Sequence, residues 1–224
     1  LMNYPFRNAI LSWLLGGDAG AFRDTMEQQR ENYPPAAFYS GMNSLGTHDT
    51  VRILTLLGVG SECRDHGRDW RAARRLSPEE RALGLARLKL AALVLYAFPG
   101  SPTVYYGDEA GMEGFEDPFN RRTFPWGRED RALTGWFRAL GRARHRFAAL
   151  RKGDIRYVRA AGPVLAFTRT WEDETVLCAA NAGPAPAELE LPGGETRTLG
   201  PWEGRLLRLE ACQAAEDVLS ERGF

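Results

Sequence analysis

The side chains best suited to chemistry stand at the end of one stretch, residues 38–52, which closes with His48, Asp49 and Arg52. An imidazole, a carboxylate and a guanidinium can together donate to and accept from the hydroxyl groups of a sugar. The stretch begins as an apolar run, and residues 53–57 after it show a helical pattern. It therefore predicts a strand, a polar turn and a helix. In α/β folds the loops past the strand's C-terminal end face a shared crevice, and the chemistry is placed there.

A second predicted strand is also followed by carboxylates. Residues 103–106 are typical of a short buried strand, and Asp108 and Glu109 come directly after it. The irregular segment that follows, residues 110–128, is rich in glycine and acidic residues and also contains aromatic residues. Loops of this length are usually functional or disordered, and the aromatic content argues against disorder. The sequence therefore repeats one arrangement, a strand followed by polar groups.

Each of these groups has a structural alternative. Asp49 could simply cap a helix beside a hydrogen-bonded His48. Asp108 and Glu109 are more typical of carboxylates that anchor loops than of catalytic ones. Trp126 could stack on a sugar face or pack beneath its own loop. For His48 and Asp49 the functional interpretation is favoured, because the two stretches agree with each other.

Helical patterns surround both stretches. The first two are predicted over residues 5–15 and 19–32. A third begins after Ser77, where the order Ser, Pro, Glu, Glu combines an N-cap, a proline at the first helical position and a glutamate at the third. A fourth, over residues 129–150, has an amphipathic stripe. These helices alternate with the strands, as they do in α/β proteins.

The pattern changes at residue 153. Short alternating runs separated by turn residues predict a small antiparallel β-sandwich over residues 153–210. The expected strands cover residues 155–160, 164–170, 175–180, 187–191 and 205–209. Residues 211–224 are polar and are expected to form a tail.

Charge and composition exclude several classes of partner. The 224 residues include 29 basic and 29 acidic ones, so no net field favours nucleic acid or an acidic membrane. The arginines of residues 58–77 lack a glycine-rich cradle or an aromatic platform, which favours a solvated loop over a phosphate site. The longest apolar run, residues 90–98, is far shorter than the ~20 residues that a membrane helix requires.

The three cysteines are few and far apart, so no disulfide framework is expected. Cys63 and His66 have the spacing of a metal-ligand pair, but no second pair follows, and we predict no metal site. No signal peptide is visible. Together these features favour a cytoplasmic over a secreted location.

Two segments carry a resemblance to a known family. Residues 43–52, Asn-Ser-Leu-Gly-Thr-His-Asp-Thr-Val-Arg, are similar to the last catalytic region of the α-amylase superfamily of glycoside hydrolases, which follows barrel strand seven. Residues 99–112, with Asp117 and Arg121 beyond them, resemble strand eight and the loop after it. The resemblance covers residues 2–209 and is strongest to the neopullulanase, cyclomaltodextrinase and maltogenic amylase group.

The resemblance implies an α/β fold. Residues 1–152 would be the C-terminal part of a TIM (β/α)₈ barrel, comprising strands six to eight, and the β-sandwich would be the C-terminal domain of such an enzyme. The implied reaction is retaining hydrolysis of α-glucosidic bonds in starch, pullulan, cyclodextrins or maltooligosaccharides. Such enzymes use a nucleophile and an acid whose carboxyl groups lie about 5–5.5 Å apart.

The resemblance also assigns roles to individual residues. Asp49 matches the catalytic carboxylate that stabilises the transition state by hydrogen-bonding the 2- and 3-hydroxyls of the sugar. His48 would donate to the same hydroxyls, and Arg52 would orient a carboxylate or bind the neighbouring glucose. Asp117 and Arg121 match loop residues that line sugar subsites in relatives.

The sequence departs from the family in one respect. The nucleophile Asp and the acid Glu belong to strands four and five, which would precede Leu1, and a full barrel needs ~250 residues. The chain is therefore expected to be a fragment that is inactive alone and needs the missing N-terminal half of the barrel. A non-catalytic sugar-binding or scaffold protein with an amylase-like fold is the alternative.

The expected partners are an α-glucan or maltooligosaccharide substrate and, for the intact enzyme, a second copy in a homodimer. No cofactor is expected in this portion. Calcium is a candidate for the missing N-terminal part.

Overall fold

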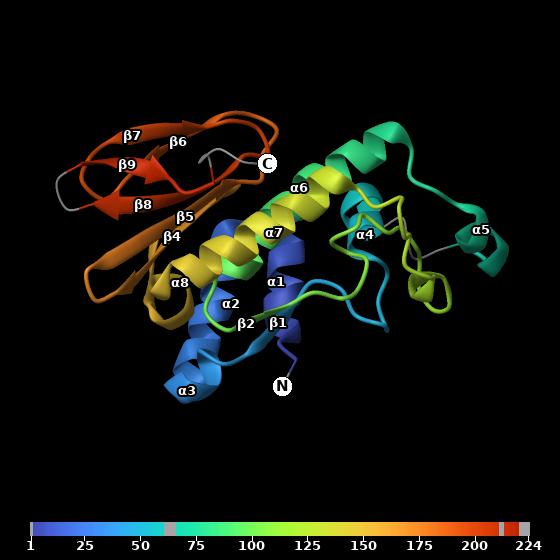
Figure 1. The fold of residues 1–224 in the computed structure, drawn as a ribbon, viewed down its shortest axis with the longest axis horizontal. Coiled ribbons are helices and arrows are strands. Elements are labelled where there is room, and N and C mark those ends of the chain that lie inside the picture. Colours follow the sequence, from blue (N-terminus) through green and yellow to red (C-terminus); the bar gives the residue numbers. More distant parts are fainter. Residues whose placement is uncertain (1, 61–65, 211–212, 220–224) are drawn as a thin grey trace.

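The computed structural model describes residues 2–60, 66–210 and 213–219 (Figure 1). Helices dominate the first two thirds of the chain, and an antiparallel sheet follows them. In Figure 1 this sheet lies at the upper left, and α6 and α7 run through the middle of the molecule. The helices are α1 (Tyr4–Leu14), α2 (Ala19–Asn32), α3 (Pro35–Phe38), α4 (Ile53–Val59), α5 (Arg68–Ala73), α6 (Pro78–Ala97), α7 (Arg131–Arg146) and α8 (Ala148–Lys152), with a 3₁₀ turn, η2, at Phe119–Arg121.

Three segments far apart in the sequence run parallel to one another. Strand β1 (Met42–Ser44) pairs in parallel with β2 (Ser101–Thr103), and Met2 forms a parallel bridge to Met42 on the other side. The Asn3 amide donates to Asn43 Oδ1 at 2.9 Å, and the Asn43 amide donates to the Pro99 carbonyl at 2.8 Å. A ladder of side-chain hydrogen bonds therefore crosses all three segments.

Both parallel strands lie a few residues away from their predicted positions. The stretch that begins at residue 38 enters its strand only at Met42, because a proline at the start of α3 favours a helical turn first. The strand predicted at residues 103–106 lies at Ser101–Thr103. Gly100 has a φ of 112°, and a Cβ there would lie 2.5 Å from the Gly41 carbonyl oxygen, so the backbones meet directly after this glycine.

The helix signals were more accurate. Ser77 Oγ accepts from the Glu80 N–H at 3.2 Å, and Glu80 Oε2 accepts from the Ser77 N–H at 2.7 Å, which is the predicted capping box of α6. Helix α2 has the predicted bounds. The helix predicted over residues 129–150 is instead broken into α7 and α8, because Phe147 takes an extended conformation and buries its ring.

The C-terminal antiparallel sheet that the sequence predicted is present. Its five strands lie in the order β3 (Asp154–Ala161), β4 (Val164–Trp171), β5 (Glu174–Asn181), β8 (Gly204–Glu210) and β9 (Gln213–Asp217). A small second sheet consists of β6 (Ala187–Glu190) and β7 (Thr196–Leu199). Strand β9 lies within the predicted tail, so that prediction was wrong for these residues. An ion pair of 2.6 Å between Arg205 and Asp217 helps to hold β9 on the sheet edge.

The five-stranded sheet is covered on both faces. One face of the sheet carries Val164, Leu177 and Leu207. Their side chains pack against leucines that lie in β6 and β7 or directly beside these strands in the sequence. On the opposite face, Leu165, Phe167 and related side chains join the core formed by the helices. The small sheet therefore completes a sandwich on one side, while helices cover the other.

A continuous core crosses the boundary at residue 153. The Phe98 ring after α6 lies 5.8 Å from the Phe167 ring of β4. The fully buried Arg169 donates to the Ala97 carbonyl at 2.6 Å and to the Gly153 carbonyl at 2.8 Å. Burial lowers the pKa of Arg169 to about 9. Helices and sheet thus share one interior although their sequence patterns differ sharply.

Candidate functional site

The turn between β1 and α4 presents His48 and Asp49 to solvent. The turn is closed by the Thr50 N–H, which donates to the Thr47 carbonyl at 3.3 Å, and by the Asp49 N–H, which donates to Thr47 Oγ1 at 3.2 Å. The two side chains are each 60% exposed, and His48 Nε2 lies 3.2 Å from Asp49 Oδ2. The imidazole and the carboxylate can therefore reach a ligand together.

The loop after β2 brings two more predicted residues to this turn. Arg121 Nη2 lies 3.6 Å from Asp49 Oδ1, and Arg121 Nε lies 3.0 Å from Asp117 Oδ1. Arg121 Nε also donates to the His48 carbonyl at 3.1 Å. The structure thus gathers His48, Asp49, Asp117 and Arg121 into one exposed cluster, which is referred to below as the His–Asp–Arg cluster. Its carboxylates, guanidinium and imidazole suit a ligand with several hydroxyl groups.

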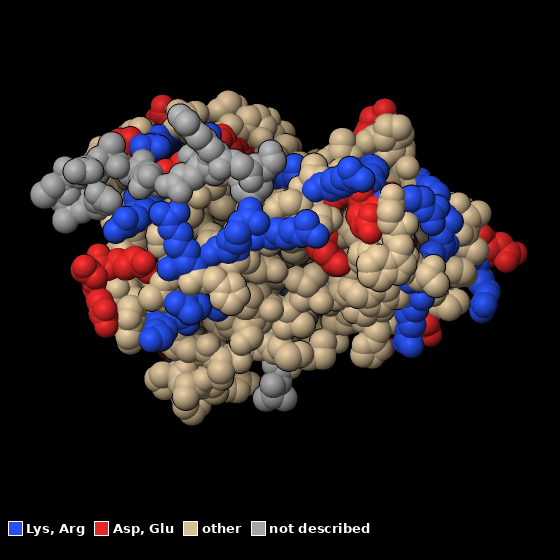
Figure 2. Space-filling view, viewed as in Figure 1, with Lys and Arg blue, Asp and Glu red and all other residues tan. Residues whose placement is uncertain are grey.

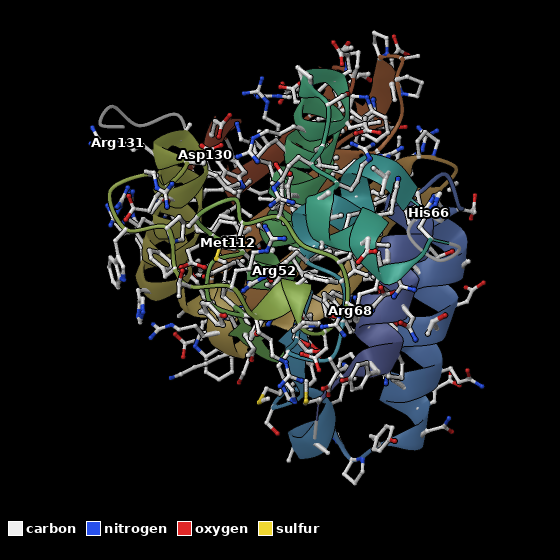
Figure 3. The ribbon with its side chains drawn as sticks, turned by 90° about the vertical axis from the view of Figure 1, so that its right-hand side faces the viewer. Arg52, His66, Arg68, Met112, Asp130 and Arg131 are labelled. Atoms are coloured by element: carbon white, nitrogen blue, oxygen red, sulfur yellow. The ribbon has the colours of Figure 1, made fainter. Side chains whose placement is uncertain are left out.

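Arg52 does not join this cluster. Its side chain has no exposed surface, and Nη1 lies 3.2 Å from Asp108 Oδ1 and donates to the Tyr106 carbonyl. The guanidinium carbon lies 4.4 Å and 4.6 Å from the ring centres of Tyr105 and Tyr106. Figure 3 shows Arg52 near the centre of this end of the molecule. Of the two roles predicted for Arg52, contact with a carboxylate is the one present, and the buried side chain offers no surface for sugar.

Asp108 is the buried partner of Arg52. A Cβ at Gly46 would lie 2.2 Å from Asp108 Oδ2, so the glycine of the first motif makes room for the carboxylate of the second. Burial raises the pKa of Asp108 to about 7, although the neighbouring Arg52 lowers it. Asp108 therefore ties the two motifs together, as expected of a carboxylate that anchors loops.

Sequence reasoning missed Asn120. This side chain is fully buried, and its Nδ2 donates to the carbonyls of His48 at 2.7 Å and Thr50 at 2.9 Å. Asn120 directly precedes Arg121, which was the only sequence signal near it. Nothing in the local pattern indicates that its partners lie on the other motif.

The arginines of residues 58–77 form ties within the structure. Arg71 pairs with Glu116 at 3.0 Å, and the Ala72 carbonyl accepts from Arg122 at 3.0 Å. Arg64 and Cys63 lie outside the described residues. Figure 2, viewed as Figure 1, shows a separate band of Lys and Arg across the middle of the molecule, where Figure 1 places α6 and α7. The predicted solvated loop thus contains a short helix, α5, that is bound to the loop after β2.

A cavity of about 840 Å³ lies beside β2 and α7, outside the His–Asp–Arg cluster. Its wall includes Tyr106, Glu109, Phe124 and Trp126 together with residues of α7. The Trp126 ring lies 4.6 Å from that of Phe124 and is 81% exposed, so it does not pack beneath its loop in the described part of the chain.

Two features are absent from the described residues. No helix in this part of the chain is long and apolar enough to span a membrane. Likewise, no group of three or more His, Cys, Asp or Glu side chains within residues 2–60, 66–210 and 213–219 is arranged to hold a metal ion.

The described residues thus combine parallel strands, an exposed His–Asp–Arg cluster and an antiparallel β-domain. Residues 156–205 match the maltogenic amylase C-terminal domain. An amylopullulanase of Thermoanaerobacter thermohydrosulfuricus is 41% identical over 181 residues, which are 75% of this chain and 12% of that protein. A cyclomaltodextrinase of Geobacillus thermopakistaniensis is 30% identical over 98% of this chain and 34% of its own length.

A solved structure agrees with these relatives. The cyclic α-maltosyl-(1→6)-maltose hydrolase of Arthrobacter globiformis has a TM-score of 0.76 at 27% identity, covering 94% of this chain and 44% of that one. The chain is therefore a relative of the α-amylase-family enzymes, and the predicted resemblance is confirmed. It spans about a third or less of the length of the curated relatives named above.

Proposed function

We propose that this chain is the C-terminal part of a retaining glycoside hydrolase that cleaves α-glucosidic bonds of α-glucans. Candidate substrates are starch, pullulan, cyclodextrins and maltooligosaccharides. The observation that carries the proposal is the exposed cluster of His48, Asp49, Asp117 and Arg121, formed by the two motifs that resemble the family. The names of the relatives, which are amylopullulanase and cyclomaltodextrinase, support the class of substrate.

In this proposal Asp49 binds hydroxyl groups of the sugar and does not itself attack the glycosidic bond. Its carboxylate accepts from the 2- and 3-hydroxyls of the glucose being cleaved, and His48 donates to the same pair. These hydrogen bonds tighten as the ring flattens towards an oxocarbenium ion, so they stabilise the transition state more than the ground state. Arg121 lies between Asp49 and Asp117 and orients both carboxylates.

The nucleophile and the acid are assigned to the N-terminal half of a barrel that precedes Leu1 in the intact protein. Met2, β1 and β2 would be strands six, seven and eight of this (β/α)₈ barrel. In the described residues β2 pairs only with β1, and Tyr106 and Trp126 are exposed. The cavity of about 840 Å³, whose wall includes these two residues, is where the missing half is proposed to dock.

The proposal includes four further expectations. The resemblance suggests the absence of a cofactor from this portion, calcium in the preceding part and a homodimer of the intact enzyme. The few cysteines and the lack of a visible signal peptide suggest a cytoplasmic location.

The test is Asp49→Asn in the full-length protein that contains this chain. Loss of a group that stabilises the transition state lowers kcat by about 10²- to 10³-fold. Folding should be nearly unchanged, because the side chain is largely exposed. Asp173→Asn, at an exposed aspartate in the turn between β4 and β5, is the matched control and should keep wild-type kcat.

Hydrolysis of the four substrates is measured beside a melting curve for each variant. Near wild-type kcat in Asp49→Asn would show that the assigned role is wrong. A wild-type protein that binds maltooligosaccharides but cleaves none of the substrates would instead favour the non-catalytic sugar-binding alternative.

A further inference from the structure

The turn that carries Asp49 leaves two of its carbonyl groups without a partner inside the turn. The internal hydrogen bonds use the Thr47 carbonyl and the Thr47 and Thr50 hydroxyls as acceptors. The His48 and Thr50 carbonyls, one on each side of Asp49, accept instead from another segment of the chain. The position of Asp49 therefore depends on what holds these two groups.

Asn120 holds both of them. Its single Nδ2 group donates to the His48 oxygen at 2.7 Å and to the Thr50 oxygen at 2.9 Å, and the side chain is fully buried. Only the amino end of an amide can donate, so two carbonyl acceptors fix the orientation of the group. Buried polar contacts of this kind are costly to lose. Without the amide the Thr50 carbonyl would lose this donor, and the His48 carbonyl would keep only the Arg121 Nε–H at 3.1 Å.

The loop that carries Asn120 is itself held at several points. At its start the Arg52 N–H donates to the Gly114 carbonyl at 2.9 Å, and the Gly114 N–H donates to Thr55 Oγ1 at 2.9 Å. Further along, Glu116 pairs with Arg71 of α5 at 3.0 Å. The contacts of its own loop therefore fix the position of Asn120, and Asn120 in turn holds the turn that carries Asp49.

The side-chain contacts of Asp49 are weaker than this backbone anchor. Its carboxylate has ionic partners at 3.2 Å and 3.6 Å, and both it and His48 are 60% exposed. Ion pairs between exposed groups contribute little free energy, so Arg121 orients the carboxylate less firmly than the buried amide holds the main chain. The position of the carboxylate is therefore set mainly by the hydrogen bonds that hold the main chain on either side of it.

We propose that Asn120 is a positioning residue that sets the place of Asp49 and His48 for the sugar by bridging the carbonyls on either side of Asp49. This inference rests on the proposed function for its effect on catalysis. Catalytic groups must be held closely, because a misplacement of about 1 Å can cost about 10²-fold in rate.

The experiment compares Asn120→Ala and Asn120→Asp with the wild-type full-length protein. Alanine removes the donor, whereas an ionised aspartate keeps the volume and turns acceptor oxygens towards both carbonyls. Each variant should lower kcat by about 10²-fold, with a much smaller change in KM. Hydrogen exchange of the amides of residues 47–51, measured by mass spectrometry, should become faster in both variants.

Asn181→Ala is the matched control. Asn181 is also fully buried, and its Nδ2 donates to the carbonyls of Ala185 at 2.8 Å and Gly200 at 2.9 Å, but it lies on β5 within the β-domain. This variant should lower the melting temperature to a similar degree while leaving kcat and the exchange of residues 47–51 unchanged.

Three outcomes would overturn the inference. They are wild-type kcat in folded Asn120 variants, an equal loss of kcat in Asn181→Ala, and unchanged exchange of residues 47–51 in the Asn120 variants. If the wild-type protein hydrolyses no α-glucan, the proposed function fails by itself, and the exchange measurement still decides whether Asn120 holds the turn.

Discussion

The interior shared by helices and sheet differs sharply from the end that carries the His–Asp–Arg cluster. In the interior, the Phe98 ring contacts those of Phe6, Phe22 and Phe167 at centroid distances of 5.3, 5.6 and 5.8 Å, and all four are buried. At the other end, His48 and Asp49 are 60% exposed and held by polar contacts. One region thus provides hydrophobic stability, whereas the other presents chemical groups on a scaffold fixed by hydrogen bonds.

The two regions also differ in how the faces and edges of their strands are covered. The five-stranded sheet has both faces covered, whereas β2 has one edge without a partner among the described residues. An unpaired strand edge is a surface on which another polypeptide can pair. The β-domain is therefore covered on both faces, whereas the parallel strands keep an open edge among the described residues.

The largest expected effect follows from the proposal that this chain is one part of a longer enzyme. Residues 1–224 alone should be inactive and should self-associate, because the β2 edge and Trp126 remain uncovered. Addition of the preceding half should reduce binding of a hydrophobic dye and restore a defined size. The measurement is sedimentation velocity with dye fluorescence, and a compact, soluble monomer of the isolated chain would contradict the prediction.

Phe98→Ala tests the stabilising side of the comparison. The ring is 1% exposed among other aromatic rings, so its removal should lower the free energy of unfolding by about 3–5 kcal/mol. Phe98→Leu keeps most of the volume and should cost less than about 1.5 kcal/mol. Urea unfolding of the full-length protein measures both. Equal losses in the two variants would show that this core is not closely packed.

The buried Asp108 is expected to make the free energy of unfolding depend on pH. Its pKa is raised by burial to about 7, against a reference value of 3.8, so the folded state holds the proton more tightly than the unfolded state. The contribution of Asp108 to stability is therefore greatest below about pH 4, falls as pH rises and levels off above about pH 7, a change on the order of a few kcal/mol.

Asp108→Asn should remove this fall while keeping an oxygen acceptor for Arg52. The difference in unfolding free energy between wild type and variant, measured from pH 4 to pH 8.5, isolates the group. A difference that does not vary with pH, or one in which the wild type gains stability relative to the variant as pH rises, would show that Arg52 rather than burial dominates.

Much of the fold could be predicted because its signals are local. The capping box at Ser77 and Glu80 and the N-cap at Asp18 involve hydrogen bonds across two or three residues, and both helices start where these signals lie. The alternation of apolar residues after residue 153 likewise predicted strands of the antiparallel sheet. Motif similarity added His48, Asp49, Asp117 and Arg121, which the structure gathers in one cluster.

The features that were missed depend on distant partners. The position of β2 follows from the close approach of Gly100 to Gly41, and the burial of Arg52 follows from the place of Asp108 on the other motif. Asn120 contacts a carbonyl 72 positions earlier in the chain. A pattern read over a few neighbouring residues cannot contain such a contact.

The sequence by itself determined where helices begin, which runs alternate as strands and which side chains could bind a sugar. Only the tertiary structure decided which of those side chains face solvent, which are buried as supports and that helices and sheet share one core. The reason is physical: capping and alternation are energies of neighbouring residues, whereas burial and long-range hydrogen bonds exist only after the chain has folded.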